Sequence, residues 1–259
     1  MSSPAPLLDF FRRGEVARDV RLLAAQGVLA PRAHEQVAIL VLLTDDKDPE
    51  VRQTALATIE RIPVEPLRAY LGRSDVPVGI REFFGDRGVF PAEIPLITAD
   101  DPLFDVSADD PDDLELEADG AAPETMLQKL QKMDIPQRLK AAMRGSRDVR
   151  AVLVRDPNKI IAAAVLSSPK VTESEIEGFA KMATIAEDVL RAIGMNRAWL
   201  KNYAVVLALT KNPKCPVGLS LNLLNRLNDR DLNGVSTDRN VPDPLRTAAR
   251  RKVVLGEKR

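Results

Sequence analysis

The two side chains best suited to nucleophilic catalysis, histidine and cysteine, occur once each in the chain, as His34 and Cys215. The stretch around His34, "LAPRAHEQVAIL", holds no serine or cysteine that a histidine base could activate. Cys215 lies near an expected helix start, where a thiolate is stabilised, but no second cysteine accompanies it. One residue of each kind forms neither an internal disulfide nor a Cys/His zinc site. We therefore interpret both as structural residues.

Glycines and acidic residues also lack the spacing that chemistry needs. Neither G-x-x-x-x-G-K-[ST] nor G-x-G-x-x-G occurs, so nothing predicts a nucleotide-binding loop. The run Asp109, Asp110, Asp112 and Asp113 is interrupted by Pro111 and lacks the glycine and glutamate of a calcium loop. We expect no catalytic residue, no metal site and no cofactor, and we interpret the chain as non-enzymatic.

Cationic residues give the strongest functional signal. They gather near three expected helix ends, and equivalent positions of successive helical repeats fall on one face. A stripe of this kind attracts phosphates or an acidic protein segment, although cations at helix ends also satisfy the helix dipole. The candidate residues for an anionic ligand or a partner are Arg144, Arg147, Arg150, Arg155, Lys201, Lys211 and Lys214. Trp199 and Tyr203 are expected one turn apart on the same helix as Lys201, where core packing is favoured over stacking on a base.

The charges divide the chain into three pieces. Residues 1–96 hold 12 basic and 14 acidic residues, 97–122 hold ten acidic and no basic residue, and 123–259 hold 25 basic and 14 acidic residues. The middle piece is poor in large apolar residues, so it predicts a flexible acidic linker, with Leu103, Phe104, Leu114 and Leu116 as candidates for docking on a neighbouring surface. We expect helical domains at 1–96 and 123–259, and whether the linker masks the basic face stays open.

Composition favours an all-α protein. Apolar residues make up 45% of the chain but aromatic residues only 4%, and the 19 prolines fit many short helices with proline at their ends. No apolar run approaches the roughly 20 residues that span a bilayer. The first residues, "MSSPAPLLDFFRRGEVARD", lack the order of a signal peptide. We expect a cytoplasmic protein without a membrane partner.

The clearest single helix is predicted in "DDKDPEVRQTALATIERIP". Asp48 is a suitable N-cap, Pro49 suits the first helical position, and Pro63 ends the segment. The residues of the predicted buried stripe are Val51, Ala55, Ile59 and Ile62. The preceding segment is apolar from Val37 to Leu43, which predicts a helix covered on several sides.

Similar local patterns recur in the C-terminal piece. "RDV" at 147–149, "EDV" at 187–189 and "RDL" at 230–232 are spaced 40 and 43 residues apart, and asparagines 158, 196 and 240 follow them. "SPK" and "NPK" close two helical segments, and Thr172 with Glu175 predicts a capping box after the first. A period near 40 residues is typical of stacked helical repeats.

Asp48, Pro49, Val51 and Arg52 resemble the Asp-Pro-x-Val-Arg start of the second helix of a HEAT repeat. The C-terminal segments resemble divergent HEAT-like or leucine-rich-variant repeats of bacterial proteins, although they lack this start. The resemblance implies an α-solenoid of short repeats that acts as a scaffold or adaptor for a protein partner. Nucleic-acid binding through the basic C-terminal face is the alternative, and an enzyme of the HEAT-like DNA-repair type, with an acid such as Glu124 or Asp134, is the third.

Overall fold

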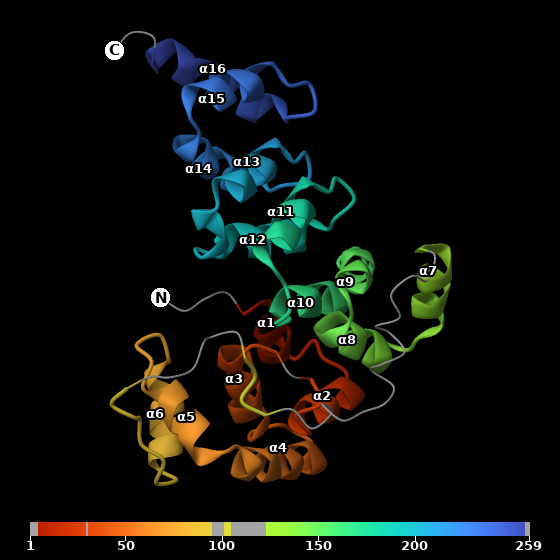
Figure 1. The fold of residues 1–259 in the computed structure, drawn as a ribbon, viewed down its shortest axis with the longest axis vertical. Helices are drawn as coiled ribbons and strands as arrows, with labels where there is room; N and C mark the ends of the chain where they lie inside the picture. Colours follow the sequence, from red (N-terminus) through yellow and green to blue (C-terminus); the bar gives the residue numbers. More distant parts are fainter. Residues whose placement is uncertain (1–4, 30, 95–100, 105–122, 257–259) are drawn as a thin grey trace. The chain divides into compact units, whose positions relative to one another are not determined.

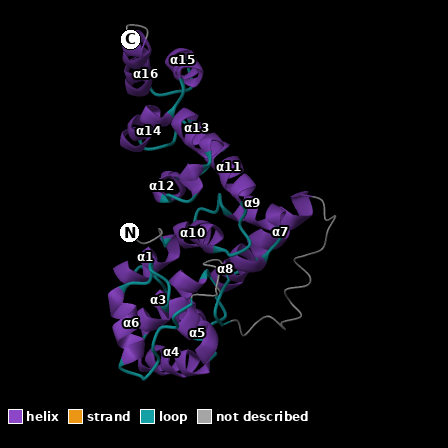
Figure 2. Cartoon of the chain, turned by 60° about the vertical axis from the view of Figure 1, so that its left-hand side comes forward, coloured by secondary structure: helices purple, strands orange, loops and turns teal. Residues whose placement is uncertain are grey.

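Every regular element in the described part of the chain is a helix (Figures 1 and 2). The computed structural model describes residues 5–29, 31–94, 101–104 and 123–256. The chain divides into two compact units, Met1–Lys170 (unit 1) and Val171–Arg259 (unit 2). The expected all-α class is therefore confirmed.

Unit 1 combines N-terminal helices with helices that follow residue 122. Its helices are α1 (Pro6–Arg13), α2 (Arg18–Ala25), α3 (Ala33–Leu43), α4 (Pro49–Arg61), α5 (Val64–Leu71), α6 (Val78–Gly85), α7 (Pro123–Lys132), α8 (Ile135–Arg144), α9 (Arg147–Leu153) and α10 (Lys159–Ser167). Helix α1 packs against α3 and α10, and α2 packs against α3, α4 and α8. The compact unit thus ends at residue 170, whereas the charges suggested boundaries at residues 96 and 122. The unit extends further because α8 and α10 bury their apolar faces against α1 and α2.

Helix α3 supplies much of the core of unit 1. The predicted apolar helix is buried at Val37, Ile39, Leu40 and Leu43, while Leu42 is exposed. Glu35, in its first turn, is 4% exposed and accepts a hydrogen bond from the Leu8 N–H at 2.9 Å. Helix α1 has no side-chain cap of its own at Ala5, so this buried carboxyl satisfies one of its free amide groups.

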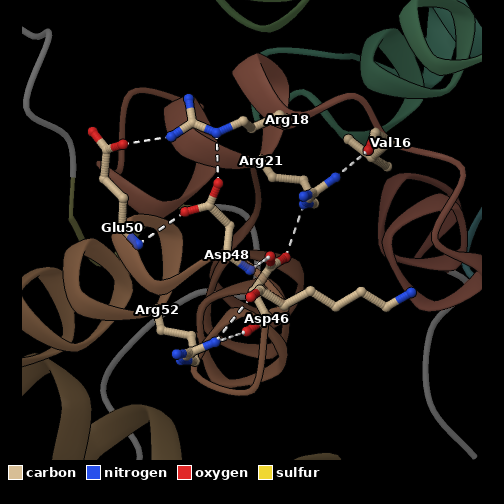
Figure 3. A network of polar contacts seen from close by, with 8 residues as sticks. Val16, Arg18, Arg21, Asp46, Asp48, Glu50 and Arg52 are labelled. Carbon is tan, nitrogen blue, oxygen red and sulfur yellow. Dashed lines mark hydrogen bonds and ion pairs between the residues drawn. The ribbon is translucent and has the colours of Figure 1, made fainter.

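The start of α4 explains why the Asp-Pro-x-Val-Arg pattern suits a helix N-terminus (Figure 3). The Asp48 side chain accepts from the Glu50 N–H at 2.9 Å, Pro49 occupies the first turn and Val51 is fully buried. Arg52 donates backwards to the carbonyl oxygen of Asp46 at 2.6 Å, which fixes the preceding loop. The predicted cap, proline and buried stripe of this helix are confirmed.

An ion pair ties the loop before α4 to a neighbouring helix, and the same device recurs before α10. Arg21 of α2 lies 2.8 Å from Asp46, and Arg138 of α8 lies 2.7 Å from Asp156. The Asp46 carboxylate also accepts from the Asp48 N–H, and the Asp156 carboxylate accepts from the Asn158 N–H. Asp48 and Asn158 are in turn the N-caps of the helices that follow. Asp46 and Asp156 are mostly buried, so each pair is screened less than a surface pair.

Of the predicted acidic linker 97–122, the structure describes only residues 101–104. Leu103 is 8% exposed and packs onto unit 1, together with Phe104. Leu114, Leu116 and the Asp109–Asp113 run lie outside the described residues.

Unit 2 consists of α11 (Glu173–Lys181), α12 (Glu187–Met195), α13 (Tyr203–Lys211), α14 (Val217–Leu223), α15 (Asp229–Thr237) and α16 (Asp243–Gly256), with single 3₁₀ turns at Trp199–Lys201 and Leu224–Arg226. Helix α13 packs beside α11 and α15, while α14 packs beside α16. Figure 1 shows α11, α13 and α15 following one another within this unit, with α12, α14 and α16 alongside. Unit 2 is therefore built from two rows of helices.

Turns of five residues with one common pattern join helices in unit 2. Each has a buried apolar residue at its fourth position, and its fifth residue directly precedes the next helix. The turns are 182–186, 212–216 and 238–242, with Ile185, Cys215 and Val241 buried at the fourth position. In the last two turns, a side-chain oxygen of the first residue accepts from the N–H two residues later. "NPK" is therefore a turn signal, as the sequence suggested.

The three triplets noted in the sequence occur in the first turns of α9, α12 and α15. Their third residues, Val149, Val189 and Leu232, are all buried. The asparagines that follow are not equivalent, which corrects the sequence interpretation. Asn158 is the N-cap of α10, whereas Asn196 is the C-cap of α12 and residue 240 lies in a turn; the residue that matches Asn158 is Asn202, the N-cap of α13. The predicted capping box of Thr172 and Glu175 is confirmed.

Candidate functional groove in unit 2

A surface groove of about 770 Å³ runs across one row of helices in unit 2. Helices α11 and α13 contribute most of its lining, and the turns after α11, α13 and α15 contribute the rest. The lining residues are Glu177, Lys181, Ala183, Ala204, Leu207, Ala208, Lys211, Asn212, Pro213, Asp238 and Asn240. Its volume lies within the usual range of 300 to 1,000 Å³ for ligand sites.

Helix α13 is apolar over most of its length and carries apolar side chains on both sides. Val205, Val206 and Leu209 are buried in the unit. Ala204, Leu207 and Ala208 line the groove on the other side, followed one turn later by Lys211. Asn202 is the N-cap of the helix, and its side chain accepts from the Ala204 N–H at 2.9 Å. The α13 side of the groove is thus apolar, with two alanines and one leucine.

The groove carries charges of both signs. On α11, Lys181 forms an ion pair with Glu177 at 2.5 Å. Lys211 extends toward α15, since its Nζ would lie 3.9 Å from a Cβ placed on Gly234. The Asp238 carboxylate accepts from the Asn240 N–H at 2.9 Å. Lys211 has no ion-pair partner among the described residues. Among the described lining residues, the cations Lys181 and Lys211 thus alternate with the carboxylates of Glu177 and Asp238, and no basic stripe forms.

Asn212 holds the rim of the groove in place. Its side-chain amide is 4% exposed and donates to the carbonyl oxygens of Ala180 at 2.8 Å and Met182 at 3.0 Å. Its oxygen accepts from the Lys214 N–H at 2.9 Å. One side chain thus joins the end of α11 to the turn after α13, which are 30 and more residues apart in the chain.

The predicted arginine cluster of unit 1 divides into buried and exposed members. Arg150 is 5% exposed and donates to the carbonyl oxygens of Gly145 at 2.7 Å and Lys170 at 3.3 Å. Arg144 is half-buried at the end of α8. Arg147 and Arg155 are exposed, at the start of α9 and just beyond its end. Arg150 is therefore a structural residue, and the exposed candidates of this cluster are two.

The three predicted lysines of unit 2 do not form one cluster. Lys201 is exposed before α13 and Lys211 ends this helix, so about 15 Å of helix separates them. Lys214 is exposed in the turn beside the groove. The groove thus includes one predicted binding residue, Lys211. The sequence pointed to Asn212, Pro213 and Asn240 only as parts of local repeat patterns, and it gave no signal for the alanine and glutamate side chains of the groove.

Trp199 and Tyr203 do not share a helix, which corrects the sequence interpretation. Trp199 lies in the 3₁₀ turn before α13 and is 7% exposed, so it is a core residue as favoured. Tyr203 begins α13, is 40% exposed, and donates to the Asp231 carboxylate at 2.5 Å.

His34 and Cys215 both occupy packed positions. The His34 Nδ1 lies 3.4 Å from the Tyr70 hydroxyl, and burial lowers the pKa of the imidazole. Cys215 is 3% exposed, and burial raises the pKa of its thiol. The neutral form of each side chain is therefore favoured in its surroundings, as expected of structural residues.

No protein-family model, curated protein or solved structure matches the chain. Among the described helices, none has the length and apolar character needed to cross a membrane.

Proposed function

We propose that this protein is a non-enzymatic scaffold of HEAT-like helical repeats whose unit 2 groove binds a segment of a protein partner. The observation that carries the proposal is the groove itself, with its apolar floor on α13 and its mixed charges. Protein interfaces combine an apolar centre with a polar rim, and this surface has that composition.

Two features support a repeat array, or α-solenoid, in unit 2. Its helices form two rows, with α13 between α11 and α15. The turns ending at Ala186, Pro216 and residue 242 share one pattern, with a buried apolar residue before each helix start. Repeats that stack in this way expose an extended surface, and scaffolds use such surfaces for binding.

The charges of the groove favour a protein segment over nucleic acid. Binding of a phosphate backbone depends on several cations in succession, since each neutralised phosphate adds to affinity. Here Glu177 and Asp238 line the same groove as Lys211, and carboxylates repel phosphates. A matching partner segment carries small apolar side chains for the α13 floor and a carboxylate for Lys211.

A matched pair of variants tests this proposal. Leu207→Arg places a long cation on the groove floor, whereas Met195→Arg places the same side chain at a position 65% exposed and outside the groove. A partner is first isolated with the wild-type chain, identified, purified and titrated against all three proteins. We expect Leu207→Arg to weaken binding at least tenfold and Met195→Arg to leave it unchanged. Equal affinities for all three proteins would refute the groove as the binding surface.

Nucleic-acid binding remains the second candidate, supported by the exposed cations Arg147, Arg155, Lys201 and Lys214. It predicts that a fluorescent DNA or RNA duplex or single strand binds the full chain and is released steeply by salt. Arg147→Glu with Arg155→Glu would then abolish binding, and Leu207→Arg would not. Absence of binding at low salt would eliminate this candidate.

A further inference from the structure

The short segment Asp101–Phe104 is held on unit 1 mainly through its backbone. The Gln36 side-chain oxygen accepts from the N–H groups of Leu103 at 2.8 Å and Phe104 at 3.2 Å. The Gln36 amide nitrogen donates to the carbonyl oxygen of Phe104. A single side chain thus satisfies three main-chain groups of a segment almost 70 residues further along the chain.

With the segment in place Gln36 is 2% exposed, so its amide is shielded from water and relies on these three bonds. A buried amide is stabilised by having all its hydrogen-bond partners, so these bonds favour the occupied site. Because Gln36 contacts main-chain atoms, its hydrogen bonds do not depend on which side chains the bound segment carries.

The side chains of the segment enter a surface that selects a Leu-Phe pair. Leu103 is 8% exposed. The Phe104 ring lies over Gly27, where an added Cβ would come within 2.6 Å of the ring Cδ1. The Arg61 guanidinium lies 5.0 Å from the centre of the same ring, a cation–π contact. Gly27 leaves room for the ring, Arg61 lies over it, and the Gln36 amide binds the main chain beside it. Together these residues form a site for an aromatic residue.

We propose that Gly27, Gln36 and Arg61 form a peptide-binding site for a short acidic Leu-Phe segment. Residues 101–104 occupy this site in cis, and the same kind of segment of a separate protein partner binds it in exchange. The sequence around the segment, "ADDPLFDVS", carries three aspartates, so a partner segment of similar charge is attracted to the Arg61 side of the site. This site lies in unit 1 and is independent of the unit 2 groove.

Tethering explains why the cis segment would mask the site. A tethered ligand has an effective concentration in the millimolar range, so it outcompetes a free peptide of equal intrinsic affinity present at micromolar concentration. Release of the segment would expose the apolar surface that Leu103 and Phe104 cover. The site would then bind partners only when they compete effectively or when the cis segment is removed.

The test uses the full chain and a fluorescent peptide of sequence ADDPLFDVS. Leu103→Ala with Phe104→Ala empties the site in the protein, and fluorescence anisotropy measures the affinity of the peptide. We expect saturable binding to this variant, at least tenfold tighter than to the wild-type chain. A peptide with both residues changed to alanine should not bind. Circular dichroism confirms folding, and Phe104→Ala alone provides a milder emptied variant.

Two glycine variants in the emptied protein separate recognition from backbone strain. Gly27 (φ +76) and Gly14 (φ +70) both adopt a left-handed conformation, but an added Cβ meets Phe104 only at Gly27 and nothing within 4 Å at Gly14. Gly27→Ala should abolish peptide binding and Gly14→Ala should preserve it. The proposal would be overturned if neither emptied variant bound the peptide. It would also be overturned if Gln36→Ala, made in the emptied protein, left the affinity for the peptide unchanged. If the wild-type chain formed a dimer and Leu103→Ala with Phe104→Ala abolished it, the site would belong to a second copy of the chain, and the proposal of a separate partner would be overturned.

Discussion

The side-chain amide of Asn212 lies 2.8 Å from the carbonyl oxygen of Ala180, and this contact joins the ends of α13 and α11. Helix carbonyls at a C-terminus lack partners within their own helix, so a neighbouring amide that reaches them stabilises both ends. The same side chain reaches Met182 and begins the turn before α14, which makes it a central contact of unit 2.

Asn212→Ala should therefore lower the free energy of unfolding of unit 2 by about 2 kcal/mol, because two buried carbonyl groups lose their donor. Trp199, the only tryptophan, is buried in this unit and reports its unfolding in urea. The exposed Asn233 of α15 provides the control, and Asn233→Ala should change the free energy by less than about 0.5 kcal/mol. Similar losses in both variants would contradict the assigned role.

Glu35 should make the stability of unit 1 fall as pH rises. Burial raises the pKa of this carboxyl above its ordinary value, and the hydroxyl of Ser167 and the N–H of Leu8 offset part of the increase. The folded state therefore favours the protonated form, so its contribution is greatest at low pH and declines between the unfolded and the folded pKa. The slope in this window is at most about 1.4 kcal/mol per pH unit.

Glu35→Gln keeps an acceptor for Leu8 but cannot ionise. Relative to Glu35→Gln, the wild-type chain should therefore lose free energy of unfolding as the pH rises from 4.5 to 7.5. Urea unfolding followed by far-ultraviolet circular dichroism measures it. A constant difference over this range would show that Glu35 ionises normally.

Two glycines should respond to alanine in opposite directions. Gly178 lies inside α11 with nothing within 4 Å of an added Cβ, so Gly178→Ala should stabilise unit 2 by up to about 1 kcal/mol. At Gly145 an added Cβ would lie 2.5 Å from the Ala141 carbonyl oxygen, so Gly145→Ala should destabilise unit 1 by about 1–3 kcal/mol. Thermal unfolding of both variants tests this, and stabilisation by Gly145→Ala would contradict the close approach.

Arg150 should matter for stability, in contrast to its exposed neighbour Arg147. Arg150→Met removes charged hydrogen bonds to Gly145 and Lys170, so we expect a loss of about 2–3 kcal/mol. Arg147→Met changes an exposed residue in the same helix and should stay within about 0.5 kcal/mol. Urea unfolding distinguishes the two, and a small effect of Arg150→Met would restore this arginine as a candidate for ligand binding.

Cys215 should accept valine, because it occupies the turn position filled by Ile185 and Val241 elsewhere in unit 2. Valine adds about one methyl group at a position where the other two turns bury isoleucine and valine, so we expect a cost below about 1.5 kcal/mol. Cys215→Ser buries a hydroxyl at the same place and should cost more. Tryptophan fluorescence in urea compares the variants. Greater loss with valine than with serine would indicate that the thiol has a polar role.

The sequence by itself determined the helical class and several helix starts, because these depend on residues within three or four positions of one another. Asp48 and Thr172 cap their helices through nearby N–H groups, and the buried stripe of α4 follows from helical spacing. The five-residue turns are local in the same sense, so "NPK" could be recognised as a turn before any helix was placed.

The tertiary structure decided which of these elements meet. Charge patterning placed a boundary before residue 123, but the packing of α8 and α10 with the N-terminal helices includes them in one compact unit. Arg150 resembled its exposed neighbours in sequence, and only the approach of Gly145 and Lys170 explains its burial. Gln36 likewise gains its role from Leu103 and Phe104, far along the chain. Such contacts depend on how apolar faces pack together, and no spacing within a single helix encodes that choice.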